Sequence, residues 1–313
     1  MNILITGGLG FIGSFFSERL AETGNTVRII DNFSGHSKDA YQVLSRNKSI
    51  SIFDRDIVTE KISDLFKGID RVYHFAANSK ISEGVNNPRI DLDITVIGTH
   101  KVLTSMADNG VGSIIYTSGS GVYGDQDSLD LDESFGPLLP VSYYGASKLS
   151  AEGYISSFCN MCGFKANIFR FANVVGYRQT HGVAYDFFYK LKSNPDKLTI
   201  LGDGNQSKSY IDVSDIFSAV NTVIDKQTKM VDVFNVSSDD YITVNQIADL
   251  TIEAMELSSV RVERGQDKCG WRGDVPKVRF NSDKLKSLGW SPKFKSLDAT
   301  KNALEYLIQN DYC

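Results

Sequence analysis

The stretch ILITGGLGFIGS, residues 3–14, places a glycine-rich turn between a short β-branched run and an amphipathic run. Its glycines fit two spacings: Gly8, Gly10 and Gly13 give G-x-G-x-x-G, and Gly7 with the latter two gives G-x-x-G-x-x-G. In either spacing the missing Cβ atoms let backbone N–H groups and a helix N-terminus meet a pyrophosphate. Tight turns also use glycine for steric reasons, so the strand, turn and helix context is what favours a dinucleotide site.

Strand-like and helix-like patterns alternate from this turn through the first half of the chain. The expected strands are residues 3–5, 27–30, 49–53, 72–75, 114–116 and 166–169, and the expected helices are 12–23, 90–109 and 144–162. Such alternation predicts an α/β fold, a doubly wound (Rossmann) parallel sheet. After Asn173 frequent Gly, Asn and Asp residues interrupt this alternation, which predicts a smaller C-terminal substrate-binding lobe. We expect residues 1–172 to form the dinucleotide-binding domain, with the chain returning to it around 210–237, and 173–313 to form mainly the second lobe.

The composition is that of a globular protein. Of the 313 residues, 42% are hydrophobic and 23% charged, and the formal net charge is −5. No Lys/Arg-rich run provides a positive field, and no stretch approaches the ~18 apolar residues of a membrane span, so we expect neither nucleic acid nor membrane as a partner. The four cysteines form neither a disulfide framework nor two zinc-ligand pairs, so we expect a reducing cytoplasm and no metal site.

Asp31 ends the second predicted strand, 18 residues after Gly13. A carboxylate there can accept hydrogen bonds from the adenosine ribose hydroxyls and repel a 2′-phosphate, which favours NAD over NADP. Arg28 is close in sequence, but its place within the strand predicts that it faces solvent. Other cofactor contacts are expected in the glycine-rich turn and at the carboxyl ends of the strands: Gly7, Gly10, Phe11, Ile12, Gly13, Asn32, Asp56, Ile57, Phe75, Ala76, Ala77 and Phe171.

Tyr144 and Lys148 stand at positions i and i+4 of a predicted helix, one turn apart on the same face. A nearby ammonium and the positive nicotinamide ring of NAD⁺ both stabilise a phenolate, and so lower a tyrosine pKa towards the range of a general base. The spacing alone is common in helices. It gains weight here because it follows the fifth strand of a sheet that begins with a dinucleotide-type turn.

Taken together, these motifs resemble the extended short-chain dehydrogenase/reductases of the NAD-dependent nucleotide-sugar epimerase/dehydratase family, in the UDP-glucose 4-epimerase-like pattern. The resemblance covers nearly the whole chain. Its matching segments are residues 6–13, 74–77, 98–99, 122–124, 144 with 148, 170–176, 201–204, 272–275 and 288–290.

This resemblance implies roles for individual residues. Tyr144 would take the sugar hydroxyl proton, and Lys148 would hold the nicotinamide ribose while lowering the tyrosine pKa; both would touch the cofactor. Asn173, Lys208 and Arg272 would meet the pyrophosphate or nucleoside of a nucleotide-diphosphate sugar, and Asp274 its ribose. The remaining substrate contacts are expected at Ser79, Lys80, His181 and Val183. Relatives also imply a homodimer formed through helices 90–109 and 144–162.

Two positions depart from the family pattern. Gly119 stands where relatives place the catalytic Ser or Thr, and Ser118 or Ser120 could supply the missing hydroxyl after a local adjustment. If neither does, Tyr144 acts without that partner. Thr95 stands where relatives commonly have Asn, which either alters the setting of the cofactor or exchanges one small polar group for another.

The resemblance also limits which reaction is expected. Related 4,6-dehydratases place carboxylates where this chain has Ser120 and Gly121. A 3,5-epimerase would need a further acid/base pair, usually Cys with Lys, and residues 118–145 contain no cysteine. An NADPH-dependent reductase is disfavoured by Asp31. Two reactions at the sugar C4 hydroxyl remain: a 4-epimerase, favoured because it needs no second acid or base, and a 4-dehydrogenase that releases the keto sugar. Glycines at 119 and 121 are expected to enlarge the sugar pocket. A catalytically silent nucleotide-binding regulator is disfavoured because Tyr144 and Lys148 are both present.

Overall fold

Parallel strands form the centre of the molecule. The computed structural model describes residues 1–37, 39–79, 81–126, 130–224, 226 and 228–311. One sheet contains seven strands in the order β3-β2-β1-β4-β5-β7-β12, every neighbouring pair parallel. The strands are β1 Asn2–Thr6, β2 Thr26–Asp31, β3 Ile50–Asp54, β4 Arg71–His74, β5 Ser113–Gly119, β7 Lys165–Phe171 and β12 Val231–Val236. This order reverses beside β1, so the predicted doubly wound fold is confirmed.

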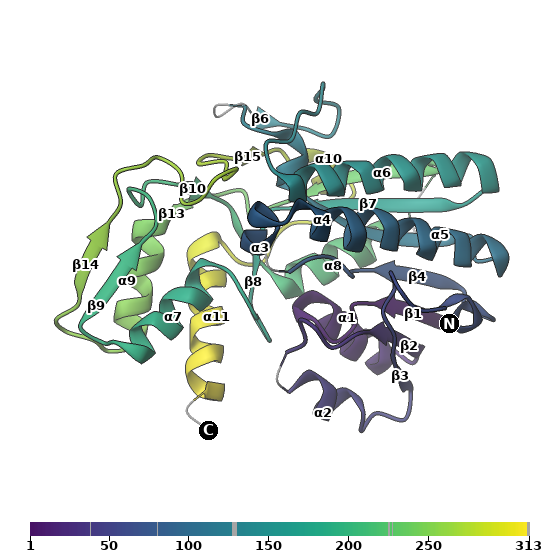
Figure 1. Cartoon of the computed structure of the whole chain (residues 1–313), viewed down its shortest axis with the longest axis horizontal. Helices are drawn as coiled ribbons and strands as arrows, with labels where there is room; N and C mark the ends of the chain where they lie inside the picture. The colour runs from purple at the N-terminus through teal and green to yellow at the C-terminus, as the bar shows by residue number, and fades with distance from the viewer. Residues whose placement is uncertain (38, 80, 127–129, 225, 227, 312–313) are drawn as a thin grey trace.

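Helices cover both faces of the sheet (Figure 1). On one face α1 (Phe11–Glu22) and α8 (Val213–Ile224) pack over Ile3 and Ile5; on the other, α5 (Gly98–Asp108) and α6 (Tyr143–Cys162) pack over Leu4. Successive residues of β1 thus serve opposite cores, as expected for a strand buried on both sides. Residues 3–5 are all apolar because both faces of β1 are buried.

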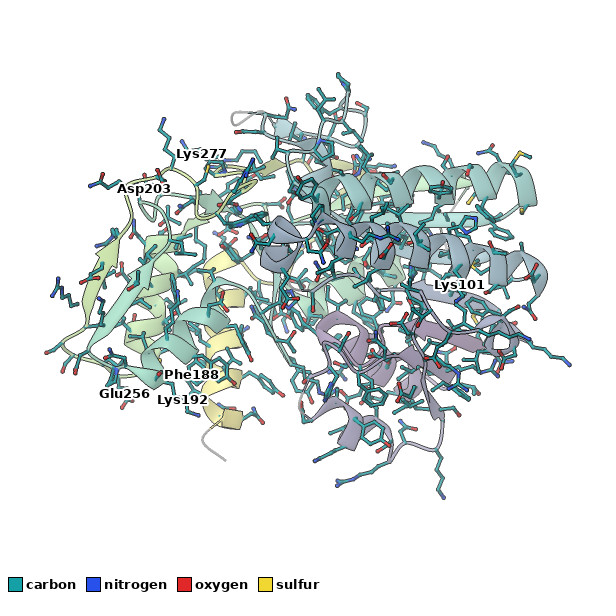
Figure 2. All side chains as sticks on the ribbon, viewed as in Figure 1. Lys101, Phe188, Lys192, Asp203, Glu256 and Lys277 are labelled. Atoms are coloured by element: carbon teal, nitrogen blue, oxygen red, sulfur yellow. The ribbon has the colours of Figure 1, made fainter. Side chains whose placement is uncertain are left out.

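A smaller lobe is built beside the carboxyl ends of the strands (Figure 1). Its core contains Phe188, Leu198, Ile247 and Leu304, and Figure 2 labels Phe188 on its helix. Its helices are α7 Val183–Ser193, α9 Val244–Ala254 and α11 Ser296–Asp311, and its paired strands are β9 Lys197–Ile200 with β14 Arg261–Arg264, β10 Ser207–Lys208 with β13 Ile242–Thr243, and β8 Asn173–Val175 with β11 Tyr210–Asp212. A further pair, β6 Asp130–Leu131 with β15 Arg279–Phe280, packs in a separate small cluster with Val122 and Tyr123. Short connecting helices are α2 Ala40–Leu44, η1 Ser63–Phe66, α3 Ile81–Asn86, η3 Ser120–Tyr123 and α10 Asp283–Lys286.

The helix expected over residues 90–109 is not uniform. It is formed by α4 (Pro88–Asp91), a π-helical turn η2 (Leu92–Ile97) and then α5. The Thr99 hydroxyl donates to the Thr95 carbonyl oxygen within this turn, so a side chain competes for a backbone acceptor. Hydrophobic spacing does not distinguish a π turn from an α turn, and π turns concentrate near functional sites. In the described part of the chain, no helix has the length and apolar character needed to cross a membrane.

Candidate active site

The glycine-rich turn joins β1 to the N-terminus of α1. A Cβ atom at Gly13 would lie 2.0 Å from the Gly7 carbonyl oxygen, so helix and turn could not approach this closely with any larger residue. A Cβ atom at Gly10 would meet only two backbone oxygens, those of Gly7 at 3.4 Å and Gly35 at 3.9 Å. No side chain of the described residues caps α1 at Gly10, and its first turn carries no acidic residue. The N–H groups of Phe11, Ile12 and Gly13 in that turn therefore fit a pyrophosphate.

Asp31 lies beside this turn at the end of β2. Its Oδ2 accepts from the Leu9 N–H at 2.9 Å and its Oδ1 from the Phe33 N–H at 2.8 Å. Burial raises the pKa of this carboxyl, and the two backbone donors oppose the rise. Each oxygen keeps a second lone pair, which suits a ribose hydroxyl. Arg28, expected to face solvent, is instead half-buried and donates to the Leu65 carbonyl oxygen, away from Asp31.

The other predicted cofactor residues fall into two groups. Phe75, Ala76 and Ala77 continue from β4 beside the turn, where the Phe75 N–H donates to the Thr6 carbonyl oxygen at 3.1 Å. Phe171 ends β7 in register with Gly119. Two others serve the fold directly: Asp56 accepts from the Asn32 side-chain amide at 2.8 Å and from the N–H groups of the following turn, and Ile57 is buried in the core beneath α5.

Asp31→Ala should weaken the preference for NAD over NADP by about tenfold, because it removes a ribose acceptor and a charge that repels a 2′-phosphate. Asp54→Ala is the matched control, since Asp54 ends the neighbouring strand β3 in register with Asp31 and carries the same charge. The measurement is the affinity for each dinucleotide by calorimetric titration. Equal changes in both variants would assign the preference to net charge rather than to Asp31.

The predicted catalytic pair, Tyr144 and Lys148, lies in the first two turns of α6, whose N-cap Ser142 accepts from the Gly145 N–H at 3.0 Å. Lys148 is 3% exposed; its Nζ donates to the Thr117 carbonyl oxygen at 2.8 Å and lies 5.6 Å from the centre of the Tyr144 ring. That carbonyl belongs to β5, so one hydrogen bond fixes the helix pair against the carboxyl end of the sheet. Tyr144 itself is half-buried.

Burial controls the ionisation of this pair. It raises the pKa of Tyr144 to about 12, with a further rise from the charge of Asp91. It lowers the pKa of Lys148 to about 8, against the opposing charges of Glu152 and Asp91. The sequence led us to expect a tyrosine pKa lowered by Lys148. In the structure of the chain itself the pKa of Tyr144 is raised instead. The cost of removing a phenolate from water is larger than the stabilisation available from a neighbouring ammonium, which is itself buried.

The hydroxyls proposed to replace the one missing at Gly119 lie on either side of it. The Ser118 hydroxyl is buried in β5 and has no hydrogen-bond partner among the described residues. Ser120 lines a small cavity together with Asn173 and Lys208. The structure thus brings Ser120 to two predicted substrate residues.

The remaining predicted substrate residues are dispersed. Lys208 forms an ion pair with Asp274 at 2.5 Å, so these two predicted substrate ligands bind each other in the structure. Asp274 also accepts a hydrogen bond from the Gly270 N–H at 3.1 Å. Arg272 is exposed on the same loop. His181 packs its ring edge-on to Phe11 with centroids 6.3 Å apart, which places it at the glycine-rich turn.

Three further predicted positions complete the substrate set. Ser79 approaches the loop after β2, because a Cβ atom at Gly35 would lie 2.9 Å from its hydroxyl. Val183 begins α7 and is half-buried. Lys80 lies outside the described residues. Among the residues that are described, no group of three or more His, Cys, Asp or Glu side chains is placed to hold a metal ion.

Comparison with known proteins agrees with this geometry. The model of the NAD dependent epimerase/dehydratase family matches residues 3–237, which is three quarters of the chain. The match covers the whole central sheet except Asn2, the first residue of β1. The chain belongs to this family. Membership confirms the family predicted from the motifs, and it confirms NAD as the cofactor.

Relatives of this family match over full length. A candidate UDP-glucose 4-epimerase of Methanocaldococcus jannaschii is 32% identical, with 99% of each chain covered. A Thermotoga maritima UDP-glucose 4-epimerase solved with UDP-glucose has a TM-score of 0.89 at 30% identity, covering 99% of both chains. A Thermus thermophilus UDP-glucose 4-epimerase solved with NAD has a TM-score of 0.87 at 26% identity, covering 99% of this chain and 100% of that one.

Arg178 has a structural role near the site that the sequence did not indicate. Arg178 is fully buried between the lobes, 3.2 Å from both Glu18 of α1 and Asp39 of the loop after β2, with its guanidinium 4.6 Å above the Tyr177 ring. It therefore ties the chain between β8 and α7 to the loop that follows Asp31. A lone arginine in sequence is usually solvated, so only the fold shows this burial.

Proposed function

We propose that the protein is an NAD-dependent 4-epimerase of a UDP-hexose. The observation that carries the proposal is the Tyr144–Lys148 pair, fixed by Thr117 at the carboxyl end of the same sheet that presents the glycine-rich turn. Full-length relatives named as UDP-glucose 4-epimerases support the reaction, and the neighbour solved with UDP-glucose supports a uridine nucleotide. In this proposal residues 1–172, with the return at 210–237, hold NAD, and residues 173–313 mainly hold the nucleotide sugar.

Each residue of the pair has a separate task. Tyr144 takes the proton of the C4 hydroxyl as the C4–H bond breaks, and later returns a proton to the C4 oxygen. Lys148, held by Thr117, orients the nicotinamide ribose and favours the phenolate. The glycine-rich turn would hold the pyrophosphate of NAD, and Asp31 would hold its adenosine ribose. Bound NAD⁺ supplies the hydride acceptor and, once reduced, the hydride donor.

Inversion at C4 needs no second protein acid or base, because one tyrosine serves both half-reactions. The family resemblance disfavours a 4,6-dehydratase, because this chain has Ser120 and Gly121 where the resemblance implies dehydratase carboxylates. The alternative, a 4-dehydrogenase that releases the keto sugar, uses the same pair. No contact among the described residues favours this release over return of the hydride.

Of the two glycines expected to enlarge the sugar pocket, only Gly119 leaves open space. A Cβ atom at Gly119 would have a single neighbour within 4 Å, the Phe171 carbonyl oxygen at 3.8 Å, so this glycine leaves open space. Gly121, expected to enlarge the pocket, instead packs on α6: a Cβ atom there would lie 3.4 Å from the Gly145 Cα. Its small size serves the contact between η3 and the catalytic helix.

The proposed reaction is tested by incubating the protein separately with UDP-glucose and with UDP-galactose and identifying the products by NMR. We expect each sugar to give the same equilibrium mixture without net formation of NADH. Conversion restricted to GDP- or dTDP-sugars would overturn the nucleotide assignment. Accumulation of a released 4-keto sugar with equivalent NADH would favour the dehydrogenase.

Gly119→Ser should raise turnover by about tenfold if neither Ser118 nor Ser120 reaches the sugar, because a hydroxyl that shares the proton network is restored. The open surroundings of Gly119 accept the new side chain without displacing a neighbour. Ser120→Ala in the same series reports on the existing hydroxyl. An unchanged rate in Gly119→Ser, together with a fall in Ser120→Ala, would assign the role to Ser120.

We also propose a homodimer formed through η2, α5 and α6, which lie side by side (Figure 1). The support is a set of large apolar side chains exposed on or next to these helices: Leu92, Ile97, Leu139, Val141, Tyr143 and Tyr154. Exposed large apolar groups on neighbouring elements are typical of an interface. A cytoplasmic location accords with free thiols at Cys159, Cys162 and Cys269.

Tyr154→Lys should convert this dimer to a monomer, because it places a charge in the apolar contact between two copies. Tyr41→Lys is the matched control, since Tyr41 is an equally exposed tyrosine on α2. Sedimentation equilibrium gives the mass of each protein. A wild-type protein of monomer mass would contradict the proposed interface.

A further inference from the structure

Asp91 places a buried carboxyl group next to the catalytic helix. It is the last residue of α4 and is 1% exposed. Its Oδ1 accepts from the Asn78 side-chain amide at 3.0 Å, and its Oδ2 has no hydrogen-bond partner among the described residues. A Cβ atom at residue 84 would lie 2.2 Å from Oδ2, so only glycine lets α3 pack on this carboxyl. A buried carboxyl with an unpartnered oxygen is costly and calls for a nearby positive or donating group.

The elements that pack around Asp91 place it near such a group. Both α4 and the π-helical turn contact α6, which carries Tyr144 and Lys148. The charge of Asp91 raises the pKa of Tyr144 and also that of Lys148, in the second case against the larger effect of burial. Lys148 in turn stabilises the ionised form of Asp91, whose pKa burial raises.

The other ionisable groups around Lys148 are already committed or uncharged. On α6, Glu152 accepts two hydrogen bonds from Arg170, at 3.0 and 2.7 Å. On β4, the ring nitrogens of His74 lie 2.6 Å from the Thr6 hydroxyl and 2.8 Å from the Thr99 hydroxyl, and burial lowers its pKa to about 3, so the imidazole is neutral. On β5, burial raises the pKa of Tyr116 well above its usual range.

The charged groups on the two short helices at Asp91 face elsewhere. Arg89 of α4 pairs with Asp93, with Nε to Oδ2 at 2.9 Å, and Glu83 of α3 is exposed. Asp91 is therefore the carboxylate near Lys148 that, among the described residues, forms no ion pair, and it acts on the Lys148 charge from beyond hydrogen-bonding distance.

We propose, on the basis of the epimerase function proposed above, that Asp91 is a positioning residue: its buried carboxylate is the counter-charge of the Lys148 ammonium and sets the pH range in which Tyr144 acts as base. A negative charge at this place keeps Lys148 protonated despite its burial, and it opposes formation of the phenolate. Without it, Tyr144 ionises at lower pH and Lys148 also loses its proton at lower pH. Both limbs of the pH–rate profile should therefore move in the acid direction.

Asp91→Asn tests the proposal, because asparagine keeps the shape of the side chain and an acceptor for Asn78 while removing the charge. Asp93→Asn is the matched control: it makes the same change two residues along, at a half-buried carboxylate of η2 that already pairs with Arg89. We expect both limbs of the kcat profile to shift by about one pH unit in Asp91→Asn and to stay in place in Asp93→Asn. A lower plateau with unmoved limbs, or an equal shift in both variants, would overturn the proposal.

A second measurement does not depend on turnover. NMR titration of the protein labelled with ¹³C at lysine Cε reports the Lys148 ionisation, assigned by its loss in Lys148→Met. We expect its pKa, about 8 in the wild type, to fall in Asp91→Asn and to remain in Asp93→Asn. If the wild type epimerises no sugar while this shift is present, the proposed reaction fails and the counter-charge stands. An unmoved Lys148 resonance in a folded Asp91→Asn or Asp91→Ser protein overturns the counter-charge itself.

Discussion

Tyr144→Phe should lower epimerase turnover by about 10²–10⁴-fold while NAD stays bound, because the change removes one hydroxyl and leaves the ring in place. In the proposed mechanism the phenol is the group that exchanges a proton with the C4 hydroxyl in both half-reactions. Steady-state rates with UDP-glucose and UDP-galactose measure the loss, and the NAD content of the purified variant shows whether the cofactor site survives.

Tyr143→Phe is the matched control. Tyr143 is the preceding residue of α6 but is 56% exposed, so the same removal of a hydroxyl should leave turnover unchanged. Comparable losses in both variants would point to the fold of α6 rather than to proton transfer. Undiminished turnover in Tyr144→Phe would remove Tyr144 from the mechanism altogether.

Gly13→Ala should weaken NAD binding by at least about tenfold and lower the free energy of unfolding by about 1–3 kcal/mol. The added methyl group would lie 2.0 Å from the Gly7 carbonyl oxygen, so α1 and the glycine-rich turn must separate. That separation moves the first-turn N–H groups away from the place of the pyrophosphate. Calorimetric titration with NAD and urea unfolding measure the two effects.

Gly112→Ala controls for the loss of a flexible residue. Gly112 precedes β5, and a Cβ atom there would meet no atom within 4 Å. We expect its NAD affinity to match the wild type. If Gly13→Ala bound NAD equally well, the glycine-rich turn would not hold the pyrophosphate.

Features set by local sequence could be predicted from it. The run of residues 3–5 has one face in each of the two sheet cores, and its continuous hydrophobicity identified a strand buried on both sides. The turn after it needs glycine at position 13 for a close backbone approach. Tyr144 and Lys148 are neighbours on one helix, so their spacing alone placed them together.

Features set by tertiary packing could not be predicted from the sequence. The carboxyl of Asp91 matters because α3 covers it at Gly84, and nothing in the spacing of α4 indicates that contact. The direction of the Tyr144 pKa depends on burial, which a sequence pattern does not measure. Gly121 resembled a pocket residue in sequence, yet its close neighbour is Gly145 of the catalytic helix.

The net charge of −5 is compatible with a doubly anionic substrate, because the groups proposed to contact phosphate act locally. The N–H groups at the start of α1 present partial positive charge without adding a cation. Lys208 contributes less than a free cation, since Asp274 already neutralises it at 2.5 Å.

The central claim is that hydride leaves C4 of the sugar and returns to C4 within one bound complex. UDP-glucose deuterated at C4 tests it directly, with the position of the label in the product read by NMR and mass spectrometry. We expect UDP-galactose that retains the deuterium at C4, with none in free NADH. A released 4-keto sugar with the deuterium in free NADH, or a product whose C4 deuterium has exchanged with solvent, would contradict the mechanism.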